Sequence, residues 1–277
     1  MKKMLSLALV LVLMMSLAAC GAKTETPAAT TAPAAAAETT AAAADTEAPA
    51  AEVKTIEAGK LIMSTNASFP PYEMIADDGT FEGIDVEVAG AIAKKLGLEL
   101  EVDDMDFDAA LLAVQQNKSD IVMAGVTVTD DRKLVMNFTD SYATGVQVVI
   151  VKEGSDVTLD NLGEKMIGTQ RGTTGYIFTS DDYGDDHVTA YDNGASAVQA
   201  LQNGQVDCVV IDAAPAEAYV EANPGLTILD TEYVVENYAI GVNKDNAALL
   251  DAINGALAEL TADGTIDTII GKYITAE

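Results

Sequence analysis

The chain has few positive charges and few arginines. Its 277 residues include 15 lysines and arginines against 44 aspartates and glutamates, which gives a formal net charge of −29. Only Arg132 and Arg171 are arginine. A strongly anionic protein is repelled by a phosphate backbone, so we expect no nucleic-acid partner. The acidic residues are spread along the chain, a pattern that is typical of a solvated exterior.

Cysteine and histidine are also scarce. The two cysteines are Cys20 and Cys208, and the one histidine is His187. Cys208 lies in the apolar run 206–211, which predicts a buried strand, so we interpret it as a core residue and not as a nucleophile. A single histidine in a polar loop is poor support for a metal site. We therefore expect no metal, no cofactor and no catalytic residue.

The N-terminus has the pattern of a signal peptide over residues 1–19. Lys2 and Lys3 precede an apolar run at 5–17, which is too short to span a membrane comfortably. The ending Leu-Ala-Ala-Cys resembles a bacterial lipobox, in which cleavage leaves a diacylated cysteine as the first residue. The resemblance implies that lipid on Cys20 anchors the protein to the extracytoplasmic face of the cell membrane. The alternative is an ordinary secreted protein with an incidental cysteine.

Residues 20–55 have the composition of a disordered tether. They consist mainly of alanine, threonine, proline and glutamate, and no large apolar residue occurs before Val53. Pro27, Pro33 and Pro49 interrupt any helix. Such a segment has no face to bury, so we expect a flexible linker between the lipidated Cys20 and a folded domain. If Cys20 carries lipid, Cys208 has no partner for an intrachain disulfide.

The remaining residues alternate between short apolar strands and segments with helical spacing. We expect strands at 61–65, 98–102, 120–124, 165–169, 188–191 and 207–211. Helices are expected at 84–96, 107–116, from 172, at 195–202 and at 214–221. Repeated strand–helix units predict an α/β architecture with largely parallel sheets.

Two long strand-like runs, 145–151 and 233–242, separate these blocks. A chain that crosses to a second lobe and returns needs such a pair. We therefore predict a first lobe from 56–143 plus 241–277, and a second lobe from 144–240 that includes the hinge strands. A closing helix at 247–260 would pack on the first lobe. A ligand would then bind between the lobes, at the carboxyl ends of the strands.

Five polar segments lie at the positions where a binding site would form. They are Asn-Ala-Ser-Phe-Pro-Pro-Tyr-Glu at 66–73, Phe-Glu-Gly-Ile-Asp-Val-Glu at 81–87, Met-Asp-Phe-Asp at 105–108, Ala-Gly-Val-Thr-Val-Thr-Asp-Asp-Arg at 124–132, and Asn-Phe-Thr-Asp-Ser-Tyr at 137–142. In this order and spacing the chain resembles the bacterial extracellular solute-binding proteins of family 3, the amino-acid-binding components of ABC importers. The resemblance covers about residues 60–273.

The resemblance implies a two-lobed periplasmic-binding-protein-like fold of type II. Each lobe is expected to be a mostly parallel sheet flanked by helices, with two hinge crossings between the lobes. The implied partners are a free amino acid and the permease of an ABC transporter, and most members of the family are monomers.

The family pattern also implies how the backbone of an amino acid would be held. Arg132 would fork onto the α-carboxylate, because a guanidinium group is planar and permanently charged. Thr127 and the backbone of Gly125 would supply further donors. Thr174, at a helix start in the other lobe, would donate as well.

Asp212 matches the carboxylate that holds the α-ammonium group, and Phe69 and Phe107 match aromatic residues that flank the ligand side chain. A zwitterion would thus meet a cation and an anion from opposite lobes, so binding would favour closure.

Simpler interpretations of these residues remain open. Thr127 and Thr129 are both placed to cap a helix that begins near Asp130. Asp212 is placed to cap the helix that starts at 214. Phe69 and Phe107 fit equally well as core residues.

Two residues bear on the ligand side chain. Asn66 stands where several relatives with amide or basic ligands have an acid, and Gln170 occupies the strand end expected to face the ligand. Amides suit a polar uncharged side chain, since a buried lysine or arginine ligand would lack a charged partner. An acidic ligand stays open if Arg171 turns inward.

These observations favour a binding protein, not an enzyme, that takes up a polar L-amino acid outside the cytoplasm and delivers it to a permease. One alternative is a lipoprotein that senses its ligand. Another is a dehydratase-like enzyme on the same scaffold, although the expected cleft offers no evident base other than Asp212.

Overall fold

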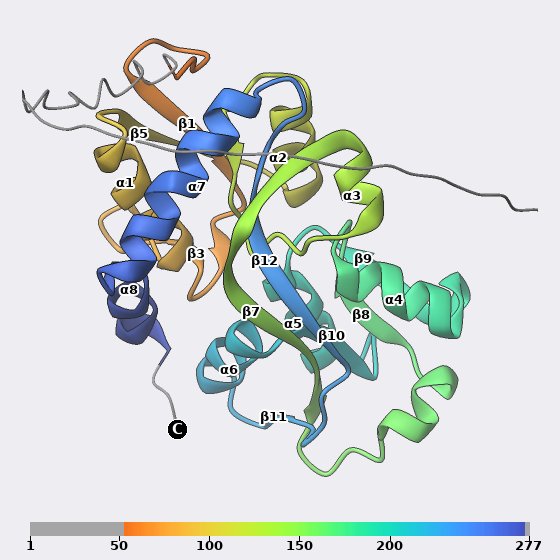
Figure 1. Ribbon diagram of the computed structural model, residues 1–277. Helices are drawn as coiled ribbons and strands as arrows, with labels where there is room; N and C mark the ends of the chain where they lie inside the picture. The colour runs from red at the N-terminus through yellow and green to blue at the C-terminus, as the bar shows by residue number, and fades with distance from the viewer. Residues whose placement is uncertain (1–52, 275–277) are drawn as a thin grey trace, which may run out of the picture. The chain divides into compact units, whose positions relative to one another are not determined.

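The computed structural model describes residues 53–274 (Figure 1). The predicted signal peptide, Cys20 and most of the predicted linker lie outside these residues. Within the described range, none of the helices combines the length and the apolar character that a membrane span requires.

One nine-stranded sheet organises the fold (Figure 1). Its strands follow the order β5 (Glu99–Asp104), β1 (Lys60–Thr65), β6 (Ile121–Val122), β12 (Val234–Asn243), β7 (Met136–Lys152), β10 (Cys208–Asp212), β8 (Ile167–Gln170) and β9 (Val188–Tyr191), and β11 (Leu226–Ile228) pairs with β7. β1 is parallel to β5 and β6, whereas β8 is parallel to β9 and β10. The mostly parallel α/β fold with two lobes is thus confirmed.

The antiparallel pair β7 and β12 joins the two parallel groups. The two strands run from Met136 opposite Asn243 to Gln147 opposite Val234, with register shifts near Tyr238 and Ala239. β7 has 17 residues and begins well before the apolar run at 145–151 that marks it in the sequence. Its first half contains polar residues such as Asn137 and Asp140, which hide the strand pattern.

Helices cover both groups of strands. Beside the first group lie α1 (Ile84–Lys95), which packs against β5, and α2 (Phe107–Gln115), which packs against β1 and β6; α7 (Ala247–Ala262) and α8 (Thr265–Tyr273) pack against α1. Beside the second group lie α4 (Thr174–Tyr183), α5 (Gly194–Gln202) and α6 (Ala213–Ala222). The short helices are α3 (Asp130–Val135) and the 3₁₀ turns Leu159–Glu164 and Asp185–His187.

The end of α1 shows how the sequence sets these elements. Ile84, Val88 and Ile92 recur at helical spacing and are fully buried. Gly97 has a φ of 70°, and the N–H of Leu98 bonds the carbonyl of Ala93 at 2.8 Å. A left-handed glycine with this backbone bond ends a helix, as the sequence predicts.

A small second sheet was not expected from the sequence. It consists of β2 (Ser68–Phe69), β3 (Glu73–Ile75) and β4 (Phe81–Glu82), paired antiparallel in that order. Strands of two or three residues are too short to show an alternating pattern. This sheet holds the 66–73 segment next to the start of α1, where the N–H of Asp85 bonds the carbonyl of Tyr72 at 2.9 Å.

We expect Gly83→Ala to destabilise the protein by about 2 kcal/mol or more. Gly83 has a φ of 126°, and a Cβ there would lie 2.3 Å from the carbonyl oxygen of Tyr72. Gly255→Ala is the matched control. Gly255 lies inside α7 with no atom within 4 Å of an added Cβ, so alanine should stabilise by about 0.5–1 kcal/mol. Urea unfolding measures both, and equal stability of the two variants would contradict the argument.

Candidate functional site

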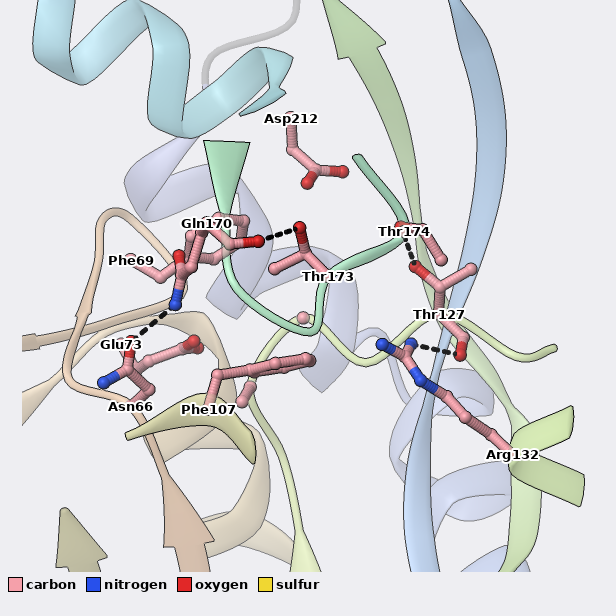
Figure 2. A pocket seen from close by; sticks show the side chains of 12 residues that line it. Asn66, Phe69, Glu73, Phe107, Thr127, Arg132, Gln170, Thr173, Thr174 and Asp212 are labelled. Atoms are coloured by element: carbon pink, nitrogen blue, oxygen red, sulfur yellow. Dashed lines mark hydrogen bonds between the residues drawn. The ribbon is translucent and has the colours of Figure 1, made fainter. Parts of the chain in front are cut away.

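One pocket brings together all nine site residues expected from the sequence. The nine residues are Asn66, Phe69, Phe107, Gly125, Thr127, Arg132, Gln170, Thr174 and Asp212. Glu73, Ala124 and Thr173 also line it and were not expected. In Figure 2, Arg132, Thr127 and Thr174 lie on one side of the pocket, while Asn66 and Glu73 lie on the other.

Arg132 is a buried cation without a carboxylate partner. Its guanidinium group donates from Nη1 to the carbonyl of Thr127 at 2.8 Å and from Nη2 to the carbonyl of Gly172 at 3.1 Å. It also lies 5.4 Å above the centre of the Phe107 ring. Within residues 53–274 the one arginine ion pair is made by Arg171. Burial lowers the pKa of Arg132, yet a guanidinium group remains charged at neutral pH.

The two threonines before Arg132 have different roles. The hydroxyl of Thr129 accepts a bond from the N–H of Arg132 at 3.2 Å, so Thr129 caps α3. Thr127 does not cap the helix. Its hydroxyl lies 3.4 Å from the hydroxyl of Thr174, the first residue of α4. The capping interpretation is therefore right for Thr129 and wrong for Thr127.

Gly125 lines the pocket, but its backbone N–H does not have the role that was expected from the sequence. Its φ is 54°, and a Cβ would lie 2.9 Å from Cε1 of Phe69, so only glycine fits here. The N–H of Gly125 donates to Oδ2 of Asp85 at 2.9 Å. It is therefore engaged inside the protein, and the expectation that this N–H serves a ligand is corrected.

Asp212 ends β10 and is the residue before α6. Its side chain makes no capping bond, so the capping interpretation is wrong. Oδ2 accepts from Nε2 of Gln147 at 2.8 Å, and Oδ1 accepts from the hydroxyl of Tyr238. Burial raises the pKa of Asp212 to about 7. These two donors hold the carboxylate at the pocket wall.

Phe69 and Phe107 belong to two separate hydrophobic clusters and also line the pocket. Each of the two residues therefore packs in the core and also lines the pocket. Tyr72 packs against Phe69 and Tyr238, with ring centres 6.0 Å and 5.2 Å away, and does not line the pocket.

Asn66 and Gln170 meet across the pocket. Nε2 of Gln170 donates to Oδ1 of Asn66 at 3.0 Å (Figure 2), which links the end of β8 to the loop after β1. Nδ2 of Asn66 donates to the carbonyl of Met105 at 2.9 Å. Arg171 lies outside the pocket, where it pairs with Asp192 at 3.5 Å. The arrangement that would favour an acidic ligand is therefore absent from the described residues.

Glu73 is the important residue that the sequence reasoning missed. It ends the 66–73 segment, but no role was assigned to it. The side chain is fully buried at the pocket wall, and no N–H or hydroxyl group of residues 53–274 donates to its carboxylate. Burial, followed by the charge of the adjacent Asp85 carboxyl and a hydrogen bond with it, raises the pKa of Glu73 well above its usual range. The argument for a neutral ligand assumed that no charged partner was present, and Glu73 removes that assumption. Glu73 belongs to the same 66–73 segment as the pocket residues Asn66 and Phe69, four positions after Phe69. Membership of that segment was the sequence signal that could have identified it.

Cys208 and His187 lie away from the pocket. Cys208 is fully buried in β10, and burial raises the pKa of its thiol to about 12. His187 ends a 3₁₀ turn. The part of the chain that the structure describes contains no group of three side chains suited to hold a metal ion.

The arrangement of the pocket and the fold agree with a family comparison. A family model described as bacterial extracellular solute-binding proteins, family 3, matches residues 61–276. The chain belongs to this family. The family is one of solute-binding proteins and not of enzymes, which is the class that the sequence motifs indicate.

Individual relatives of this family 3 protein carry names that refer to amino acids. A probable histidine-binding protein of Neisseria gonorrhoeae is 34% identical over 222 residues, which are 78% of this chain and 83% of the relative. The ABC transporter arginine-binding protein 1 of Escherichia coli (strain K12) is 31% identical over 221 residues, 78% of this chain and 91% of that protein.

Solved structures show the same fold. An ancestral arginine-binding protein bound to arginine superimposes with a TM-score of 0.74 at 41% sequence identity, covering 78% of this chain and 98% of that protein. The two-lobed architecture of this solute-binding protein is therefore that of the amino-acid-binding proteins it resembles.

We expect Asp212→Asn to stabilise the protein at pH 8 by on the order of 1–3 kcal/mol, with little effect at pH 4. The pKa of Asp212 is about 7 in the folded protein, against 3.8 for an ordinary aspartate in water. Between pH 3.8 and pH 7 the folded state therefore binds more protons at Asp212 than the unfolded state does. The stability that this bound proton contributes is lost as pH rises through 7. Thermal unfolding at both pH values measures the difference.

The control for this prediction is Asp77→Asn, the same change on an exposed turn residue, which should alter stability little at either pH. Equal effects of Asp212→Asn at pH 4 and pH 8 would contradict the assignment of the raised pKa.

Proposed function

We propose that this protein binds a free L-amino acid with a polar side chain outside the cytoplasm and delivers it to the permease of an ABC transporter. The observation that carries the proposal is the buried guanidinium of Arg132. A buried cation without an anionic partner is costly, so the site is arranged for an anion that arrives with the ligand.

The α-carboxylate fits the side of the pocket where Arg132 lies. Arg132 offers a planar fork for bidentate bonding, and the hydroxyls of Thr127 and Thr174 lie beside it (Figure 2). Thr174 is the first residue of α4, where backbone N–H groups favour negative charge. Gly125 contributes because it has no side chain, so the ligand can approach its backbone closely.

The α-ammonium group fits Asp212. This carboxylate is already oriented by Gln147 and Tyr238, which donate to it and leave further lone pairs for a ligand cation. Arg132 and Asp212 lie on elements of the two different strand groups. A zwitterion that contacts both would hold the lobes together, which favours the closed arrangement.

The remaining pocket residues indicate a polar ligand side chain. Asn66 and Gln170 supply amide groups at the end of the pocket away from Arg132, and Phe69 and Phe107 supply apolar faces. We propose that all nine residues contact the ligand, and that the lobes are formed by 56–143 with 241–277 and by 144–240.

The proposed location and partner rest on the N-terminal sequence and on the relatives. The lipobox-like Leu-Ala-Ala-Cys supports a lipid anchor on Cys20 after removal of residues 1–19, with the linker to about residue 55 as a tether. The Escherichia coli relative is named as a binding protein of an ABC transporter, which supports a permease as the partner. We propose that the protein acts as a monomer.

We expect Arg132→Ala to lower the affinity for the preferred amino acid by about 100-fold or more, because a buried charged hydrogen bond to the carboxylate is lost. Isothermal titration calorimetry with each common amino acid at pH 7.5 identifies the ligand and measures the loss.

Arg171→Ala is the matched control, since it removes the other arginine of the chain at an exposed position outside the pocket. Its affinity should stay within about threefold of the wild type, as for a weak surface ion pair. Absence of heat with every amino acid, or full affinity in Arg132→Ala, would overturn the proposal.

A further inference from the structure

Glu236 is a buried carboxylate that lies outside the pocket and has no part in the contacts proposed so far. It belongs to β12, one of the two strands that join the lobes, and is 4% exposed. Its Oε2 accepts a hydrogen bond from Nε2 of Gln147 at 2.8 Å, whereas Oε1 is buried with no donor among residues 53–274. Replacing such a carboxylate by an apolar side chain often costs no stability, so packing alone does not account for it.

Gln147 of β7 connects Glu236 with the pocket. Its side-chain amide has two N–H hydrogens, and Nε2 donates at 2.8 Å both to Glu236 and to Oδ2 of Asp212. The other end of the amide, Oε1, lies against Gly175, where an added Cβ would be 2.9 Å away. Oε1 has no donor among the described residues. The two carboxylates are therefore the groups that fix the position and the orientation of this amide.

The strand pairing brings these groups to one point. Gly145 of β7 lies opposite Glu236, and Gln147 lies opposite Asp212. A Cβ on Gly145 would lie 2.7 Å from Oδ1 of Asp212 and closer still to the hydroxyl of Tyr238. The Asp212 carboxylate is thus enclosed, with Tyr238 donating to one oxygen and Gln147 to the other. Movement of either donor would move the carboxylate.

The charge of Glu236 also acts on the pocket. Burial raises the pKa of Asp212 to about 7, and the charge of Glu236 adds to this rise. Burial lowers the pKa of Arg132, and Glu236 is the charged side chain that opposes this change most strongly. Glu236 is therefore a neighbour of both charged groups that are proposed to receive the amino acid, although it does not line the pocket.

We propose that Glu236 is a positioning residue for the recognition of the ligand amino group. It holds the Gln147 amide in place, and the amide holds the Asp212 carboxylate where the α-ammonium binds. This inference rests on the proposed function, because it assumes that Asp212 receives the α-ammonium. Without an acceptor at Glu236 the amide is free to turn, and turning brings its Oε1 toward the Asp212 carboxylate, which repels it.

The test compares an amino acid with the same molecule without its α-amino group. Calorimetry at pH 8, where Asp212 is ionised, gives the ratio of the two dissociation constants, and a competition titration measures the weaker ligand. The pair is built on the amino acid that binds most tightly: for L-glutamine the partner is glutaramate, and for L-arginine it is 5-guanidinopentanoate. We expect a ratio of about 100 or more in the wild type, because loss of the ammonium leaves a buried carboxylate unpaired.

Variants at Glu236 and Gln147 examine the chain of hydrogen bonds. Glu236→Leu removes the acceptor and should lower the ratio by about tenfold. Glu236→Gln keeps an oxygen that accepts from Gln147, so its ratio should stay within about threefold of the wild type. Gln147→Met removes the donor and should act like Glu236→Leu. The double variant should be no worse than either single change, because the two residues act in series.

Asn243→Leu is the matched control. Asn243 is another buried amide of β12, and its Nδ2 donates to the carbonyls of Val114 and Gln115 of α2 and not to a pocket residue. This change should lower the melting temperature and keep the wild-type ratio. An equal fall of the ratio in Asn243→Leu would mean that any buried polar loss produces the effect, which would overturn the role of Glu236.

The other outcomes separate this inference from the proposed function. An unchanged ratio in Glu236→Leu, an equal loss in Glu236→Gln, or additive effects in the double variant would overturn the role of Glu236 while amino-acid binding stands. A ratio near one in the wild type would overturn both this role and the ammonium contact at Asp212. If the wild type binds no amino acid, the proposed function itself fails.

Discussion

The antiparallel pairing of β7 with β12 is the constraint on which the site depends. This pair joins the two groups of parallel strands, and it also supplies residues that orient Asp212 in the pocket and Asp85, which accepts from the N–H of the pocket residue Gly125. Gln147 of β7 and Tyr238 of β12 both donate to Asp212, and Tyr142 of β7 donates to Asp85. The Thr127 bridge to Tyr238 attaches the segment before Arg132 to the same pair. A change in the register of these strands would therefore disturb both ends of the pocket.

The charged side chains buried in the pocket lower the stability of the folded protein. Arg132, Asp212 and Glu73 are all more than nine-tenths buried, and the pKa values of both acids are raised because burial disfavours their charged forms. A hydrophobic core of the same volume would not carry this cost. Such unfavourable burial is common where a protein must bind a charged ligand, since the ligand supplies the missing partners. The donors inside the protein are arranged to hold the charges in place and not to neutralise them.

Local patterns were enough to predict most of the fold. The buried stripe of α1 and the apolar run of β10 depend on neighbouring residues in the chain, so their periodicity is visible in the sequence. The motif segments likewise predicted six residues that line the pocket, and the strand and helix ends of the second lobe predicted the other three, Gln170, Thr174 and Asp212. The polar first half of β7 and the short strands β2, β3 and β4 were not visible, because pairing partners and not side-chain patterns make them strands.

The sequence alone determined the family, the α/β class and the position of Arg132 in the pocket, because these follow from motifs whose order along the chain is distinctive. The tertiary structure decided which groups are free to meet a ligand. Gly125 is engaged by Asp85, 40 residues away, and Gln170 meets Asn66, 104 residues away, whereas Glu73 is buried without a donor. Hydrogen-bond satisfaction depends on residues far apart in the sequence, so only the folded chain shows which of the pocket's polar groups are engaged by other residues.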